Sequence, residues 1–326
     1  MYKLDEQLIK GNPVKQSVRK ALGHALAELG AQHQDVVAVT ADLASSVGLA
    51  EFKERHGARF IETGIAEQNL VTLASGLAHE GKAVYLAAYA AFSPGRNWEQ
   101  IRTTICLNDQ PVKVIGSHTG LNVGPDGATH QMLEDIALMR VLPNMTVLAP
   151  GDANEAAQMV QAVYDYPHPV YIRVPRSDQV VFLTPDDNFK IGKAYVVRQD
   201  DEATITLLST GTMTGTALLV AQALAERGIG ASVVHVPTIK PLDRETILRE
   251  VGKNSVAVTL EEHQVAGGFG SAIAELLLES GVVPQVFKRI GVNDQFGQSG
   301  TADELLAHYG LDVAGVLRQI TQLIGE

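Results

Sequence analysis

A strand, a glycine turn and a helix follow one another in the run Phe60-Ile61-Glu62-Thr63-Gly64-Ile65-Ala66-Glu67-Gln68-Asn69. The residues from Arg59 to Thr63 have the composition of a short strand, and Gly64 allows the chain to turn. Apolar side chains then recur at helical spacing, at Ile65, Leu70, Leu73 and Leu77. We therefore expect Glu67 in the first turn of an apolar helix at the carboxyl end of a strand, where α/β proteins build their sites. A plainer role for this carboxylate is to complement the helix dipole.

The same alternation of strand and helix continues along the chain. The first part contains expected strands at residues 36–40, 59–63, 84–89, 112–117, 146–149 and 170–174, with helical periodicity over 18–29 and 153–164. Several of these strands are apolar at consecutive positions, as parallel strands covered on both faces are. The pattern predicts an α/β protein with a doubly wound, mostly parallel sheet.

A turn-rich stretch, Thr184-Pro185-Asp186-Asp187-Asn188, interrupts this alternation. A second alternation follows, with strands expected at 204–209, 231–236, 255–260 and 286–290 and helices at 217–227, 244–251 and 271–279. We place a boundary near residue 190, which predicts a first domain of residues 1–190 and a smaller C-terminal α/β domain of residues 191–326.

Composition excludes several classes of protein. The 326 residues include 26 Lys and Arg against 37 Asp and Glu, a net charge of −11 that opposes non-specific binding to nucleic acid. No apolar run is long enough to cross a bilayer, and the first residues lack the pattern of a secretory signal, so a cytoplasmic location is expected. Cys106 is the only cysteine, which excludes an intrachain disulfide; we interpret it as a small core residue.

A second informative run is Gly116-Ser117-His118-Thr119-Gly120-Leu121-Asn122-Val123-Gly124-Pro125-Asp126-Gly127-Ala128-Thr129-His130-Gln131. It places two histidines, an aspartate and four glycines between an expected strand and the next helix. Glycines let the backbone of such a loop approach a ligand, and histidines can serve as acid and base near neutral pH.

Three of these motifs together carry a family resemblance. Gly64-Ile65-Ala66-Glu67, Tyr89-Ala90-Ala91-Phe92 and the Asp-Gly-Ala-Thr-His-Gln run occur in the order found in transketolase. The chain resembles the C-terminal half of that thiamine-diphosphate enzyme, namely its pyrimidine-binding domain and its third domain. A further segment, Glu261-Glu262-His263-Gln264-Val265-Ala266-Gly267-Gly268-Phe269-Gly270, is shared with deoxyxylulose-phosphate synthase and, more loosely, with the β subunits of 2-oxo acid dehydrogenases.

The resemblance implies a cofactor site. Glu67 would hold N1′ of the thiamine pyrimidine, in a dry pocket that keeps the carboxyl group protonated near neutral pH. Phe92 would stack on the pyrimidine and Tyr89 would line the pocket, although aromatic pairs are also usual core residues. Family members carry phenylalanine where Tyr89 stands, and Arg96-Asn97-Trp98 also departs from the family pattern.

The resemblance also implies a substrate site. His118 and His130 would contact the reacting oxygens, with pKa values suited to neutral pH, and Asp126 would bind a substrate hydroxyl. Arg176 matches the arginine that grips the substrate phosphate, where a guanidinium can bind two oxygens at once. Structural histidines and surface salt bridges are the simpler alternatives. For Arg173 we prefer a surface salt bridge.

The implied function is that of the C-terminal subunit of a split transketolase, moving a two-carbon ketol unit from a ketose phosphate to an aldose phosphate. The family's Gly-Asp-Gly motif does not occur here in its usual context, so an N-terminal partner subunit is expected to hold the diphosphate and Mg²⁺, and no metal ligand is expected in this chain. The expected assembly is a homodimer core within a heterotetramer. The alternatives are a 2-oxo acid dehydrogenase β subunit, a deoxyxylulose-phosphate synthase-like subunit and a non-catalytic scaffold.

Overall fold

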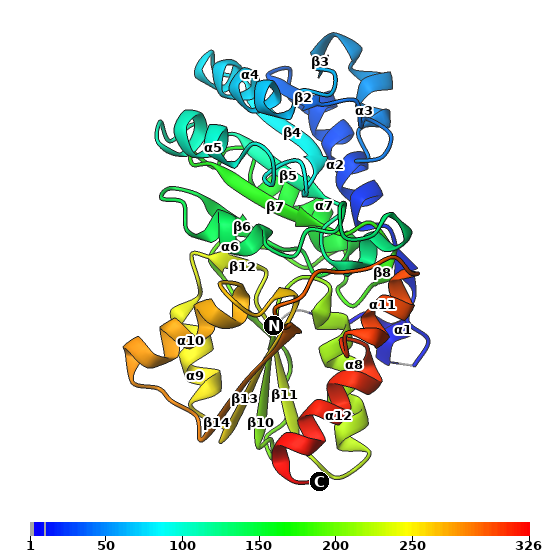
Figure 1. Cartoon of the computed structure of the whole chain (residues 1–326), viewed down its shortest axis with the longest axis vertical. Helices are drawn as coiled ribbons and strands as arrows, with labels where there is room; N and C mark the ends of the chain where they lie inside the picture. The colour runs from blue at the N-terminus through cyan, green and yellow to red at the C-terminus, as the bar shows by residue number, and fades with distance from the viewer. Residues whose placement is uncertain (1–2, 10) are drawn as a thin grey trace.

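The computed structural model describes residues 3–9 and 11–326. It contains two large sheets, one in the upper and one in the lower half of Figure 1. The upper sheet has seven strands in the order β12-β6-β7-β5-β4-β2-β3, all parallel except β12. Their bounds are β2 (Val36–Thr40), β3 (Phe60–Glu62), β4 (Ala83–Tyr89), β5 (Lys113–Ser117), β6 (Thr146–Leu148), β7 (Val170–Val174) and β12 (Thr238–Lys240). The predicted mostly parallel α/β sheet is confirmed.

Helices cover both faces of this sheet because the side chains of each strand alternate between two cores. Val36 and Ala38 of β2 join one core together with α2 (Val18–Gln32) and α7 (Ala153–Ala162). Val37 and Val39 join the other, against α4 (Glu67–His79) and the π-helix η2 (Ile101–Cys106). The remaining helical elements of this half are α3 (Ala50–Arg55), η1 (Gly57–Arg59), α5 (Trp98–Gln100), η3 (Leu121–Asp126) and α6 (Asp135–Arg140).

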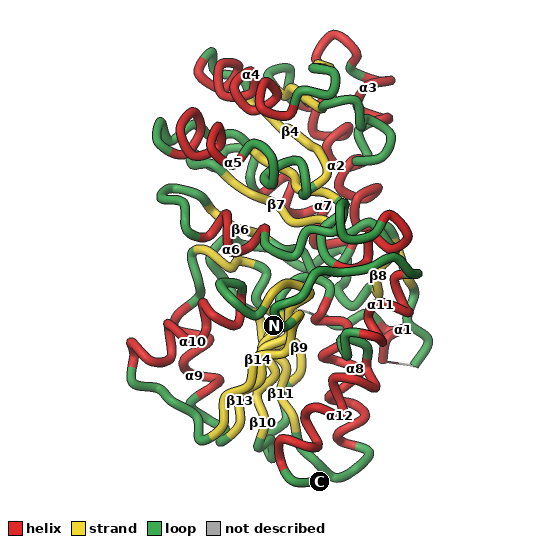
Figure 2. The backbone as a smooth tube through the Cα atoms, in the orientation of Figure 1, coloured by secondary structure: helices red, strands yellow, loops and turns green. Residues whose placement is uncertain are grey.

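The lower sheet has five strands in the order β14-β13-β10-β11-β9, of which only β9 is antiparallel. The bounds are β9 (Tyr195–Arg198), β10 (Ile205–Ser209), β11 (Ala231–His235), β13 (Val256–Gln264) and β14 (Val286–Val292). Figures 1 and 2 show α9 (Arg244–Val251) and α10 (Phe269–Ser280) on one side of it, and α8 (Met213–Ala225) and α12 (Val313–Ile324) on the other. The other elements are α11 (Ala302–His308), α1 (Glu6–Ile9) and the small antiparallel pair β1 (Lys15–Gln16) and β8 (Gln179–Val180).

Four short strands, β1, β8, β9 and β12, were not anticipated from the sequence, and β12 is the most informative of them. β12 lies well beyond the proposed boundary near residue 190, yet it pairs antiparallel with β6 of the upper sheet, Thr238 opposite Leu148. A three-residue strand between two prolines is too short for an alternation pattern to reveal. The division at residue 190 stays a prediction, and β12 shows that the later part of the chain contributes to the upper sheet.

Several boundaries also differ from the expected ones for local reasons. α4 begins at Glu67, so Ile65, which we placed on the apolar face of that helix, precedes it and is 77% exposed. β13 extends four residues beyond the expected strand, because its charged residues find buried partners. Cys106 is buried, and this burial raises the pKa of its thiol to about 12, as suits a core residue. Within the described residues, no helix combines the length and apolar character that spanning a membrane requires.

Candidate active site

The predicted site residues gather at the carboxyl edge of the upper sheet. Glu67 follows β3, Tyr89 ends β4, His118 follows β5 and Arg176 follows β7. These strands are parallel neighbours or near neighbours, so their carboxyl ends meet at one edge, the usual place for a site in such a fold.

Four ring-bearing side chains from two separate motifs form one cluster. Tyr89 stacks on His118, with ring centroids 3.8 Å apart and planes 21° apart. The ring centroid of Phe92 lies 5.9 Å from that of Tyr89 and 5.5 Å from that of His130. The rings of Phe92 and His130 pack edge to face. The aromatic segment and the glycine-rich loop, which are separate in the sequence, therefore contact each other through these rings.

Glu67 is buried, with 3% of its surface exposed, as the apolar helix suggested. Its Oε2 accepts a hydrogen bond from Nη1 of Arg96 at 2.9 Å, and the Arg96 guanidinium lies 4.8 Å from the centroid of Phe92. The pocket around this carboxyl group is therefore not purely apolar, because the Arg96 guanidinium contacts it. The departure seen in the sequence at Arg96 thus alters the environment of Glu67 directly.

His118 differs from the expected acid–base histidine. It is 2% exposed, and its Nδ1 lies 2.9 Å from the hydroxyl of Ser117. Burial lowers the pKa of His118 to about 3, and the positive charges of Arg19 and Arg176 act in the same direction. A pKa suited to neutral pH was therefore wrong for this residue, whose imidazole is neutral near pH 7 and serves as a hydrogen-bonding group.

Arg19 is a charged neighbour of His118 that the sequence analysis missed. It lies in α2, donates from Nη1 to the carbonyl of Ser46 at 2.6 Å, and brings a second positive charge toward His118. An arginine in the first turn of an apolar helix has no motif of its own, so only the folded chain reveals this proximity.

The glycine-rich loop folds into tight turns over the same edge. Gly124 and Gly127 have φ values of +79° and +76°, which favour glycine. Arg176 donates from Nη1 to the carbonyl of Val123, and the same atom lies 3.8 Å from Oδ2 of Asp126. The structure thus places the predicted substrate residues beside one another, with Arg176 partly exposed.

Arg173 is not the surface salt bridge that we preferred. It is 8% exposed, and its Nε donates to Oδ2 of the fully buried Asp135 at 2.8 Å. Its Nη2 donates to the main-chain carbonyl of Glu262, in β13, at 2.7 Å. Arg173 therefore connects β7 of the upper sheet to β13 of the lower sheet. Its position three residues before Arg176 gave no sign of this contact.

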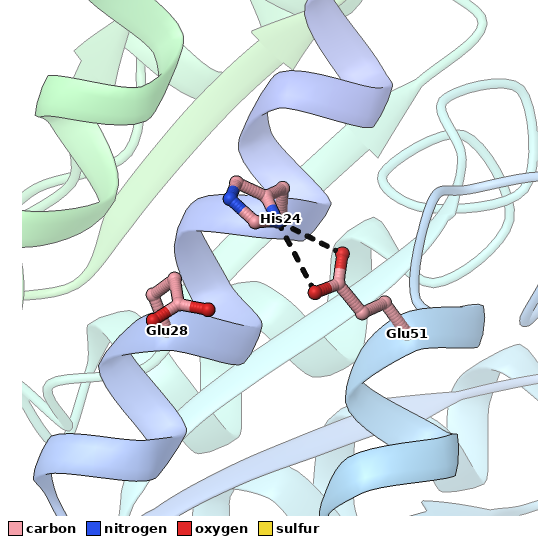
Figure 3. Close-up of side chains that lie close together, drawn as sticks. All are labelled: His24, Glu28 and Glu51. Carbon is pink, nitrogen blue, oxygen red and sulfur yellow. Dashed lines mark hydrogen bonds and ion pairs between the residues drawn. The ribbon is translucent and has the colours of Figure 1, made fainter.

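One group of side chains has the spacing of metal ligands. Within the described residues it comprises His24 and Glu28 of α2 and Glu51 of α3, drawn in Figure 3. Nη1 of Arg55 donates to both carboxylates, and its hydrogen bond lowers the pKa of Glu28. We interpret the group as an ion-pair network, because an arginine already neutralises its acidic members.

Two mostly parallel sheets with their helices define an α/β protein, and the rings and the buried glutamate lie at the strand ends where such proteins build their sites. The family model for the transketolase pyrimidine-binding domain matches residues 14–179, and the model for the transketolase C-terminal domain matches residues 192–316. The chain belongs to the transketolase family.

Three similar proteins illustrate the range of this relationship. A protein of Methanocaldococcus jannaschii, named as a transketolase C-terminal section, is 38% identical over 97% of this chain and 98% of its own length. The solved structure described as "Split gene transketolase, inactive beta4 tetramer" is 39% identical, covers 95% of this chain and 98% of that chain, and has a TM-score of 0.87. The 1-deoxy-D-xylulose-5-phosphate synthase 2 of Geobacter sulfurreducens is 38% identical over 97% of this chain but only 50% of its own length.

Proposed function

We propose that this chain is the C-terminal subunit of a split, thiamine-diphosphate-dependent transketolase that moves a two-carbon ketol unit from a ketose phosphate to an aldose phosphate. The observation that carries the proposal is the end-to-end match to proteins named as transketolase C-terminal or split-gene chains. Thiamine diphosphate supplies the nucleophilic carbon that accepts the ketol unit.

The cofactor side of the site fits the pyrimidine half of that group. The carboxyl group of Glu67 is buried and can hydrogen-bond a ring nitrogen, and Phe92 and Tyr89 offer aromatic faces beside it. In this proposal Arg96 gives up its hydrogen bond to Glu67 when the pyrimidine binds, so that the carboxyl group can share a proton with N1′. Mg²⁺ and the diphosphate are held mainly by the partner.

The substrate side fits a phosphorylated sugar. His118, as a neutral imidazole, and His130 would hold the reacting oxygens, while Asp126 would accept a hydrogen bond from a neighbouring hydroxyl. The guanidinium of Arg176 would donate hydrogen bonds to two oxygens of the substrate phosphate. Arg19 adds a second positive charge at the same edge.

The proposed partner is an N-terminal transketolase subunit that carries the diphosphate and metal site. We propose two copies of each subunit, with a core formed by two copies of this chain. The relative described as an inactive tetramer of β chains supports a requirement for a second kind of subunit.

A second candidate reaction is that of deoxyxylulose-phosphate synthase, in which pyruvate loses CO₂ before its remaining two carbons join an aldose phosphate. The 38% identity to a synthase over 97% of this chain supports this reaction as a second candidate.

Reconstitution with the N-terminal subunit separates the two reactions. The assembled enzyme should convert a ketose phosphate and an aldose phosphate into a new pair of sugars without releasing CO₂. Release of CO₂ from pyruvate, together with no exchange between sugars, would instead identify a synthase.

A further inference from the structure

A glutamate of the lower sheet reaches the substrate loop of the upper one. Glu262 lies near the end of β13, is 4% exposed, and directs its carboxyl group at Asn122. Oε1 accepts from the main-chain N–H of Asn122 at 2.8 Å, and Nδ2 of Asn122 donates to the two carboxyl oxygens at 3.0 and 3.1 Å. These partners are all N–H donors, so both carboxyl oxygens act as acceptors, and burial raises the pKa of this carboxyl group.

Asn122 also holds Arg176, the proposed phosphate-binding arginine, through hydrogen bonds. Its Oδ1 accepts from the main-chain N–H of Arg176 at 2.8 Å and from that of Ser177 at 3.3 Å. Its Nδ2 also donates to the carbonyl of Thr119 at 3.1 Å, next to His118. One amide side chain therefore joins the loop, the arginine segment and the lower sheet.

The packing leaves little freedom for this arrangement to relax. Gly120 has φ +75°, and a Cβ at this position would lie 2.3 Å from Oε1 of Glu262, so the loop comes as close to the carboxyl group as glycine allows. A second contact holds the far end of the loop, where Nε2 of Gln131 donates to the carbonyl of Gln298 at 3.0 Å.

We propose that Glu262 is a positioning residue, which through Asn122 sets Arg176 and the loop that carries His118 in the geometry needed to bind a phosphorylated sugar. Glu262 itself touches no substrate. The inference rests on the proposed function, because it assigns Arg176 to a phosphate. It gives the C-terminal half of the chain an indirect part in substrate recognition.

The neighbouring residue provides a matched control. Glu261 is equally buried in β13, but its carboxyl group accepts from the main-chain N–H groups of Phe269 and Gly270, at 2.6 and 2.8 Å, at the start of α10. Burial raises the pKa of Glu261 to about 8, and a glutamine side chain has the same length and shape as the glutamate that it would replace. Both glutamates can therefore be changed to glutamine, and only one of them contacts the loop.

The test compares Glu262→Gln with Glu261→Gln in the assembled enzyme. Glu262→Gln should raise KM for a phosphorylated acceptor roughly 10- to 100-fold, the scale expected when a binding group is slightly misplaced. The loss should be much smaller for an unphosphorylated aldehyde, and Glu261→Gln should leave both KM values unchanged. Equal losses for both acceptors, or equal losses in the two variants, would overturn the inference.

A double variant and a binding measurement complete the design. In Glu262→Gln/Asn122→Asp the donor and acceptor exchange places, so the contact between the two side chains can form again, while the bond to the Thr119 carbonyl is lost; KM should therefore recover in part. Affinity for inorganic phosphate, measured on the full chain by ³¹P NMR, should fall in Glu262→Gln and recover in part in the double variant. If the parent enzyme transfers no ketol unit but shows this pattern, the proposed function fails and the positioning role stands. An unchanged phosphate affinity in Glu262→Gln would overturn the positioning role.

Discussion

Two buried glutamates, Glu67 and Glu262, face the same edge of the upper sheet but have contrasting partners. They are 3% and 4% exposed, so both have left water almost completely. Glu67 has a side-chain hydrogen bond from Arg96, whose own side chain is 52% exposed. Glu262 is held by main-chain and side-chain amides of the buried Asn122.

The difference separates a group that can exchange partners from one that cannot. The half-exposed Arg96 stays hydrated if it turns away, and an incoming ring nitrogen can take over its hydrogen bond to Glu67. Withdrawal of a buried amide would leave the Glu262 carboxyl group unsatisfied, which costs about 1–3 kcal/mol or more. Glu67 is thus suited to receive a ligand, and Glu262 to hold a loop still.

The largest effect is expected from Glu67→Gln in the reconstituted enzyme. An amide cannot share a proton with N1′ as a carboxyl group can, and loss of such proton transfer costs about 10²- to 10⁴-fold in rate. Deuterium exchange at C2 of bound thiamine diphosphate measures the step. Glu80→Gln, an exposed change at the other end of α4, is the control. Exchange at the parent rate in Glu67→Gln would remove this residue from the proposed role.

A smaller, selective effect is expected from Arg176→Ala. Loss of a charged hydrogen-bond donor should weaken kcat/KM for a phosphorylated acceptor by roughly 1.5–3 kcal/mol. The kcat/KM for an unphosphorylated aldehyde, measured by steady-state kinetics, should change little, because that substrate has no phosphate for the guanidinium to bind. If both substrates lose activity equally, Arg176 serves the fold or the cofactor instead.

Arg96→Ala sharpens the comparison by removing the exchangeable partner. The cofactor would no longer have to displace a guanidinium, so its affinity for the assembled enzyme should rise by up to about fivefold, the equivalent of ~1 kcal/mol for a partly exposed pair. Fluorescence titration with thiamine diphosphate checks this, with Arg96→Lys as the charge-retaining control. A marked loss of affinity in Arg96→Ala would show that Arg96 helps to hold the cofactor.

The smallest effect concerns the pH profile. The pKa of His118 is about 3 because the ring is buried near two arginines, so its charge does not change between pH 5 and 8. His118→Asn should therefore lower kcat/KM while leaving the shape of its pH dependence over that range unchanged. Loss of an acidic limb in this variant would mean that His118 titrates near neutrality after all.

The sheet was readable from the sequence because its buried strands are apolar in almost every position. β2 and β7 have the predicted bounds, and Glu67 lies in the first turn of α4 as expected. β12 escaped prediction because three residues carry no period. The extended end of β13 escaped because Glu261, Glu262 and His263 look exposed until their buried partners are known.

The candidate site shows the same limit. Motifs identified Glu67, Tyr89, Phe92, His118, Asp126, His130 and Arg176, and folding brings these residues to one edge. The partners that set their chemistry are distant in the sequence: Arg96 for Glu67, Arg19 for His118, and Glu262, 140 residues beyond Asn122. Such pairings depend on tertiary contacts, and composition or spacing does not reveal them.

The central claim is that this chain provides one side of a shared cofactor site. Glu67 and Phe92 offer contacts to a neutral ring, and those few contacts must offset the freedom lost on association. Calorimetric titration of the purified chain with thiamine diphosphate and Mg²⁺, with and without the N-terminal subunit, tests this directly. The account predicts tight binding and ketol transfer only for the mixture. Micromolar binding and turnover by the chain alone would contradict it.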